Sequence, residues 1–269
     1  MEGAVVSFNK KDKVGDDMAS YLSQEEVELL GNHFKYYNEV VDGTVSPLET
    51  VHVRELFTEE GLDELLDELH DYWESEDMLA TASMFTTRIG IYMVTTYLVP
   101  MSLFSKMPGL DPENIQMHRL DDNSLWFPKW KNDNALRSEQ GDQDRIEWIE
   151  AQVIDLVEEF IRPLFVNVHY LTRLPMKTMW ENFAIYVYWF YEQYYAKIAN
   201  EEIHSRIQKD FKVIKDGLSG DIFYSKRNPL SQLQYQPCQP DGAHNRKLCC
   251  LTHKMNDESK YCRTCPNRP

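Results

Sequence analysis

Apolar residues recur every three or four positions through most of the first 217 residues, which is the spacing of amphipathic helices. The clearest case is segment 58–73, where Leu62, Leu65, Leu66 and Leu69 form one apolar stripe opposite an acidic face. The same spacing predicts further helices over residues 23–37, 78–100, 142–162, 176–199 and 200–217.

Local signals refine these helices. Ser23 with Glu26 three residues later forms a capping-box pattern, which marks a helix start. Pro163 should interrupt or kink the helix that precedes it, because proline lacks the backbone N–H. Aromatic residues surround nearly the whole helix over 176–199, which favours a buried core helix; the alternative is that part of this set lines a binding groove.

The longest uncharged apolar run, residues 89–105, is predicted to be a buried helix. Pro100 interrupts it, Arg88 precedes it, and it is shorter than the roughly 20 residues that a membrane-spanning helix needs. We therefore expect no membrane span, and we expect Arg88 to be a paired core arginine.

Two other regions depart from helical spacing. Short runs over 115–120 and 124–130 flank Asp121-Asp122-Asn123 and predict a β-hairpin. After Gly217 the chain has little periodicity. The predicted fold is mainly α, a single helical domain with a small β-hairpin and an irregular C-terminal tail. We divide it into a helical body, 1–225, and a tail, 226–269.

Charge is distributed unevenly between these two parts. Residues 226–269 carry eight basic and three acidic side chains, a net charge of +5, which leaves −21 on residues 1–225 of a chain with a total of −16. A strongly acidic chain is a poor partner for nucleic acid. Residues 1–17 contain no apolar core of a signal peptide, so we expect a cytoplasmic protein, where thiols stay reduced and clustered cysteines tend to bind metal.

All five cysteines fall within the last 32 residues. Cys249 and Cys250 are adjacent, and Cys262-Arg-Thr-Cys265 follows after eleven residues. A Cys-x-x-Cys turn lets two thiolates converge on one metal centre, whereas adjacent residues of an extended chain point to opposite faces. A two-iron cluster, which takes two thiolates on each iron, tolerates this arrangement better than a single zinc ion. Structural zinc and a redox or disulfide role remain open alternatives.

Three nearby side chains are less suited to be ligands. Cys238 lies outside the motif and is predicted to be a free thiol. His244 and His253 flank the adjacent cysteines, but with four cysteines present we expect them at the surface or in contact with the ligands.

The segment Arg246-Lys247-Leu248-Cys249-Cys250-Leu251, followed by Cys262-x-x-Cys265-Pro266, resembles the signature of the FhuF-type ferric-siderophore reductases. Those proteins hold a [2Fe–2S] cluster on a similar run of four cysteines, with a gap about one residue shorter. Trp180-Glu181-Asn182 and Asn228-Pro229-Leu230 are also similar to family features. The resemblance is strong over about 20 residues of the chain.

The resemblance implies a cytoplasmic ferric-siderophore reductase whose tail binds a [2Fe–2S] cluster through Cys249, Cys250, Cys262 and Cys265. Adding one electron to the bound Fe³⁺ would release it, because hard oxygen donors bind Fe²⁺ far more weakly.

From charge alone, Lys254, Lys260 and Arg263 are candidate contacts for an anionic ferric siderophore and for the cluster. The chain has no nucleotide- or flavin-binding motif, so a ferredoxin, flavodoxin or reductase is the expected electron donor. The alternatives are a zinc-stabilised helical binding or scaffold protein, and a redox-inactive relative of siderophore-biosynthesis enzymes.

Overall fold

A computed structural model describes residues 22–34, 36, 49–119, 126–139, 144–194, 201–233, 238–240, 242–256 and 260–268. The chain is mainly helical with a small amount of antiparallel sheet, as predicted. Its α-helices are α1 (Gln24–Phe34), α3 (Glu59–Tyr72), α4 (Met78–Met93), α5 (Val99–Phe104), α6 (Arg145–Asp155), α7 (Arg162–Thr172), α8 (Met176–Tyr188) and α9 (Glu201–Lys212).

The predicted helix starts rest on the capping residues that the sequence indicated. At α1 the Ser23 N–H donates to the Glu26 carboxylate at 2.7 Å, and the Glu26 N–H donates to Ser23 Oγ at 3.2 Å, a complete capping box. At α3 the Thr58 side chain accepts from the Gly61 N–H at 3.1 Å. All four leucines of the predicted α3 stripe are buried.

Pro163, which was expected to interrupt or kink its helix, and Pro100 both lie inside longer helical runs. Pro100 is the second residue of α5 and follows a π-helical segment, η2 (Val94–Leu98); Pro163 is the second residue of α7 and follows another, η4 (Leu156–Ile161). The wider π turn makes room for a proline ring and removes the need for its missing N–H. The predicted helix end at 162 is therefore wrong, because the run continues to 172; the run through Pro100 continues to 104, past the predicted end at 100 and in agreement with the buried helix expected over 89–105.

The predicted hairpin is an antiparallel pair with a later second strand. Strand β3 (Ile115–Arg119) pairs with β4 (Lys129–Asn132), whereas we predicted a strand over 124–130. The predicted turn residues 121–123 lie outside the described part of the chain. Strand β1 (Glu49–His52) joins the other edge of β3, and β2 (Lys106–Pro108) pairs with β5 (Leu136–Ser138). These three strands of three or four residues were not predicted, because they are too short to show a period.

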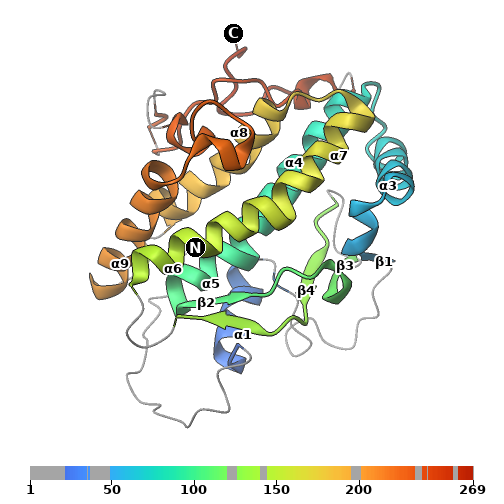
Figure 1. The fold of residues 1–269 in the computed structure, drawn as a ribbon. Helices are drawn as coiled ribbons and strands as arrows, with labels where there is room; N and C mark the ends of the chain where they lie inside the picture. The colour runs from blue at the N-terminus through green and yellow to red at the C-terminus, as the bar shows by residue number, and fades with distance from the viewer. Residues whose placement is uncertain are drawn as a thin grey trace.

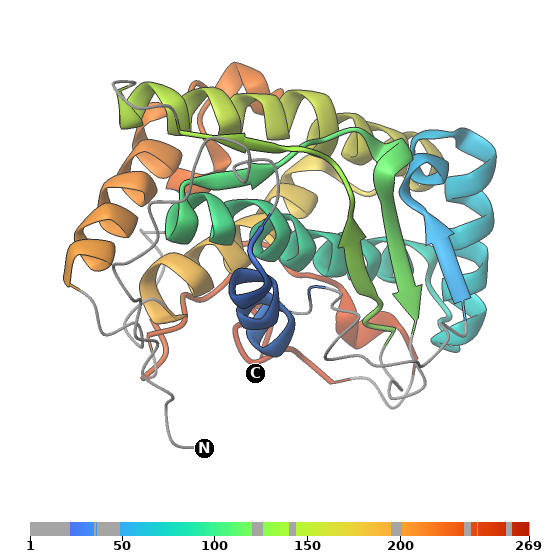
Figure 2. The same cartoon turned by 90° about the horizontal axis from the view of Figure 1, so that it is seen from below.

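Helices α4 and α8 form the centre of the fold. Figure 1 shows them between the strands below and the C-terminal segment above, and Figure 2 shows the strands and α1 on the lower face. Most of the aromatic set on α8 is buried, as predicted: Trp180, Phe183 and Tyr188 are at most 1% exposed. Within the described residues, no helix has the length and apolar character needed to cross a membrane.

Gly90 of α4 permits the close approach of α8. A Cβ at this position would lie 3.1 Å from the Phe183 Cα and 3.2 Å from the Asn182 carbonyl oxygen, and backbone atoms of a packed helix move only with the helix. The chain therefore brings the backbone of α8 against α4 at the level of Asn182.

We expect Gly90→Ala to lower the free energy of unfolding by about 1–2 kcal/mol, because overpacking outweighs the better helix propensity of alanine. The matched control is Gly217→Ala, where the nearest atom to the new Cβ is a Val213 side-chain carbon at 3.6 Å, an ordinary contact. Urea denaturation measures both. A Gly90→Ala protein as stable as the control would contradict the close approach.

Candidate metal centre

The chain after α9 is held on the helices by hydrogen bonds from buried side chains. The Trp180 indole N–H donates to the Phe223 carbonyl at 3.0 Å. The Asn228 amide donates to the Ile214 carbonyl at 2.9 Å, and its oxygen accepts from the Leu230 N–H at 2.9 Å. Short 3₁₀ turns of this segment pack on α8 and α4, so that the tail lies across the top of the helices in Figure 1.

A buried arginine joins the cysteine segment to the helical body. Arg246 is 7% exposed, and its guanidinium donates to the Asn182 side-chain oxygen at 2.8 Å. The Asn182 amide nitrogen in turn donates to the Ser83 carbonyl and hydroxyl at 3.0 and 3.1 Å and to the Thr86 hydroxyl at 3.1 Å. Asn182 is fully buried, so its oxygen is held in a fixed direction for the arginine.

Glu181, the neighbour of Asn182 on α8, fixes the backbone just before the first cysteine. One carboxylate oxygen accepts from the N–H groups of Lys247 at 2.7 Å and Leu248 at 2.8 Å. Burial raises the pKa of Glu181, and these two hydrogen bonds oppose the rise. Two adjacent α8 residues therefore position three consecutive residues of the tail.

The second cysteine pair of the motif is brought to the first by the backbone. The Arg246 N–H donates to the Thr264 carbonyl at 2.8 Å, and the Cys265 N–H donates to the Cys262 carbonyl at 3.1 Å across the turn. Leu251 has a positive φ of 61°, which bends the chain immediately after Cys250. The bent backbone that adjacent cysteines require is present.

The four cysteines form two pairs, and each pair takes one member from each half of the motif. The Cys249 and Cys265 sulfurs are 3.8 Å apart, and the Cys250 and Cys262 sulfurs are 3.5 Å apart. None of the five cysteines is disulfide-bonded. Two thiolates on one tetrahedral metal ion at a metal–sulfur distance of about 2.3 Å lie about 3.8 Å apart. Each pair thus has the separation of two ligands on one ion.

Within the described residues, no group of three or more His, Cys, Asp or Glu side chains has the geometry to hold one metal ion.

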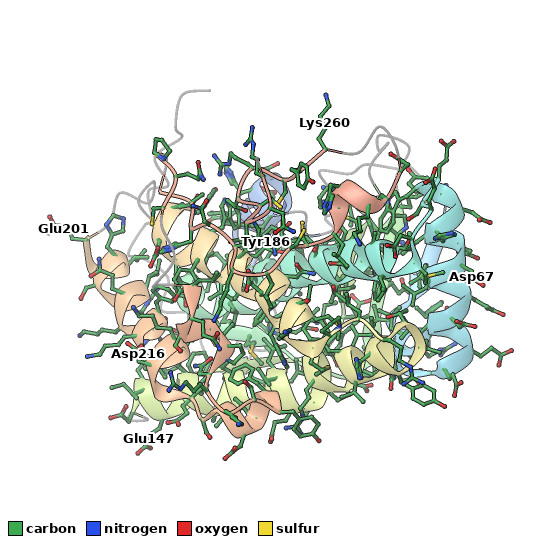
Figure 3. The ribbon with its side chains drawn as sticks, turned by 90° about the horizontal axis from the view of Figure 1, so that it is seen from above. Asp67, Glu147, Tyr186, Glu201, Asp216 and Lys260 are labelled. Atoms are coloured by element: carbon green, nitrogen blue, oxygen red, sulfur yellow. The ribbon has the colours of Figure 1, made fainter. Side chains whose placement is uncertain are left out.

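Cys250 and Cys262, called the inner pair below, lie beside the buried guanidinium of Arg246. The hydrogen bond with Cys262 lowers the pKa of Cys250 to about 5, and Arg246 acts in the same direction. The same hydrogen bond raises the pKa of Cys262. Tyr186 also lies near this pair, and burial raises the pKa of its phenol. Figure 3 shows Tyr186 under the C-terminal segment.

Cys249 and Cys265, called the outer pair below, receive hydrogen bonds from backbone amides. The Leu251 N–H donates to the Cys249 sulfur and the Asn267 N–H donates to the Cys265 sulfur, each at 3.4 Å. His253 places Nδ1 3.6 Å from the Cys249 sulfur and stacks on the Tyr261 ring, 4.3 Å between centroids. His253 therefore contacts a candidate ligand, as predicted.

The basic residues chosen from charge alone are solvent-exposed. Lys254, Lys260 and Arg263 are all exposed, and Figure 3 shows Lys260 pointing away from the helices. The buried cation at the cysteines is Arg246, which charge counting did not single out. Its position in the motif was visible, but its burial depends on Asn182, which is 64 residues away in the chain.

Cys238 lies outside both pairs. It is exposed, and its sulfur is 3.6 Å from His244 Nδ1. His244 is 6% exposed, and its Nε2 is 2.6 Å from a Glu192 carboxylate oxygen. The expected surface or ligand-contact role of His244 is wrong: it is a buried residue that pairs with Glu192 of η5 (Trp189–Tyr194), the π-helical segment that follows α8. Arg88 differs from the expected paired core arginine: it is half-buried, its Nε has no hydrogen-bond partner among the described residues, and its guanidinium carbon lies 3.7 Å from the centroid of Phe127.

We expect Asn182→Leu to lower the free energy of unfolding by about 2–4 kcal/mol, because it leaves a buried guanidinium without its acceptor. Adding Arg246→Met should recover part of this loss. In the double-mutant cycle, measured by urea denaturation, a coupling energy of at least about 1 kcal/mol supports the contact, and strict additivity argues against it.

Comparisons of the chain with protein-family models, with curated proteins and with solved structures give no match. A function is therefore inferred from the cysteine arrangement and its motif.

Proposed function

We propose that this protein is a cytoplasmic ferric-siderophore reductase, and that Cys249, Cys250, Cys262 and Cys265 hold a [2Fe–2S] cluster. The observation that carries the proposal is the division of four thiols into two pairs with sulfur separations of 3.8 and 3.5 Å. A [2Fe–2S] cluster needs two thiolates on each iron, and each pair supplies them. The resemblance of the motif to the FhuF-type signature supports the same reading.

The surroundings of the thiols suit an anionic cluster. Four thiolates and two sulfides around two Fe³⁺ ions make a dianion, and one-electron reduction makes it a trianion. Arg246 places a buried positive charge beside the inner pair, and amide N–H groups of Leu251 and Asn267 donate to the outer pair. These groups offset negative charge and favour the reduced state.

The chemistry that the cluster supplies when bound is the transfer of one electron. The electron passes to the Fe³⁺ of a siderophore complex, which becomes Fe²⁺ and is held weakly by hard oxygen donors. The protein's own residues bind and position the reactants. The electron comes from a ferredoxin, flavodoxin or reductase, because the sequence contains no nucleotide- or flavin-binding motif.

Iron and sulfide analysis of anaerobically purified protein tests the cluster. We expect about two irons and two sulfides per chain, with visible absorption that bleaches on dithionite addition. Cys262→Ser should lose iron, colour and ferric-siderophore reduction together, whereas Cys238→Ser, outside both pairs, should keep all three. A colourless protein that contains one zinc, or that contains Cys249–Cys265 and Cys250–Cys262 disulfides, would contradict the proposal.

Arg246 should set the potential of the cluster. We expect Arg246→Gln to lower the reduction potential by about 50–100 mV, equivalent to about 1–2 kcal/mol for one electron, because a charge beside the trianion is lost. Arg246→Lys should retain most of the wild-type value. The reduction potential is measured by potentiometric titration, and only preparations with full iron content are compared. Identical potentials in all three proteins would show that Arg246 acts on folding alone.

A further inference from the structure

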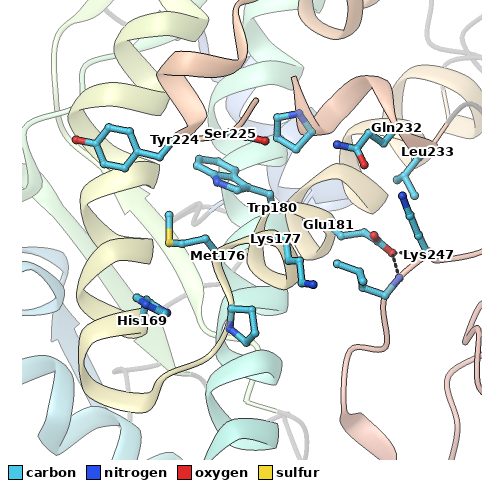
Figure 4. Close-up of a pocket in the computed structure, with 13 residues that line it drawn as sticks. His169, Met176, Lys177, Trp180, Glu181, Tyr224, Ser225, Gln232, Leu233 and Lys247 are labelled. Atoms are coloured by element: carbon cyan, nitrogen blue, oxygen red, sulfur yellow. Dashed lines mark hydrogen bonds between the residues drawn. The ribbon is translucent and has the colours of Figure 1, made fainter. Parts of the chain in front are cut away.

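A pocket of about 560 Å³ opens next to the cysteine segment. Its lining comes from the end of α7, the first turns of α8, the segment 224–233, and Lys247 with Leu248, as Figure 4 shows. The volume falls within the usual range for small-molecule sites. Leu248 is part of the lining, and Cys249 of the outer cysteine pair is the next residue in the chain.

The lining combines an apolar floor with a cationic rim. Trp180 lies at the centre of the lining in Figure 4, with Met176 beside it. Lys177 and Lys247 line the pocket and are both exposed. The Glu181 carboxylate also lines it, but one of its oxygens already accepts two backbone N–H groups. The charged side chains that remain available to a ligand are therefore mainly positive.

Tyr224 adds an aromatic group held in an unusual conformation. It is 69% exposed and has a positive φ of 52°, a region that bulky residues rarely occupy. The Arg162 guanidinium lies 4.4 Å from its ring centroid. This conformation ends the 3₁₀ turn η8 (Gly220–Phe223), with the Tyr224 N–H donating to the Asp221 carbonyl, and it leaves the ring exposed at the rim of the pocket.

We propose that this pocket binds the ferric chelate, and that the chelates it prefers carry net negative charge, as ferric catecholates and hydroxycarboxylates do. This inference rests on the proposed function, since it places the substrate of that reaction. Lys177 and Lys247 attract the anionic chelate, and the half-buried Met176 contacts its apolar parts. Lys247 and Leu248 link the two sites directly, because they line the pocket and lead into Cys249.

Binding is tested without electron transfer by using gallium(III), which has the charge and size of Fe³⁺ but is not reduced. Isothermal titration calorimetry compares trianionic gallium tris-catecholate with uncharged gallium tris-hydroxamate. We expect Lys177→Glu and Lys247→Glu each to weaken the tris-catecholate roughly five- to twentyfold and to change the tris-hydroxamate less than about twofold. The matched control is Lys209→Glu, which makes the same charge change at an exposed position of α9.

Three outcomes overturn the inference. The first is unchanged tris-catecholate affinity in both pocket variants. The second is a loss confined to Lys254→Glu and Lys260→Glu, which would place the chelate on the exposed tail. The third is a pocket variant that slows turnover with the electron donor while gallium binding is intact, which would make the pocket a donor site.

The proposed function fails separately. Its failure appears as missing iron and sulfide in the wild-type chain, whereas gallium binding needs no cluster. A chain with a full cluster and unchanged gallium affinities in the pocket variants would keep the proposed function and exclude this pocket.

Discussion

A buried positive charge needs an acceptor, and this requirement fixes where the cysteine tail lies. Arg246 is 7% exposed, so leaving its guanidinium unpaired would cost several kcal/mol. Its acceptor is Asn182, which α4 holds through Ser83 and Thr86. Asn182 reaches α4 because Gly90 has no Cβ to keep the helices apart. The packing of α4 on α8 therefore determines the position of the tail, and with it the position of the thiols.

Much of the helical body could be predicted from sequence, because its signals are local. The Ser23–Glu26 capping box and the leucine stripe after Thr58 depend on residues within one or a few helical turns. The errors came from context. Pro100 and Pro163 should end helices by backbone rules, yet preceding π turns accommodate them. A π turn leaves no pattern in the sequence of one chain, so the continuation past Pro163 could not be foreseen.

The candidate site could likewise be predicted from the sequence only in part. The motif spacing identified four cysteines and the need for a bend after Cys250, which Leu251 supplies. It could not show that each cysteine of the adjacent pair faces one cysteine of the Cys-x-x-Cys turn, because this depends on the hydrogen bond from Arg246 to Thr264. Charge counting favoured exposed residues such as Lys260 over Arg246, because composition carries no information on burial.

The five residues before the bend connect the body, the pocket and the thiols. Arg246 points into the body and pairs with Asn182, while Lys247 and Leu248 line the pocket. Cys249 and Cys250 then face different partners in the turn. Because neighbouring residues of one short segment serve each task, a ligand in the pocket and the sulfurs are held by the same backbone.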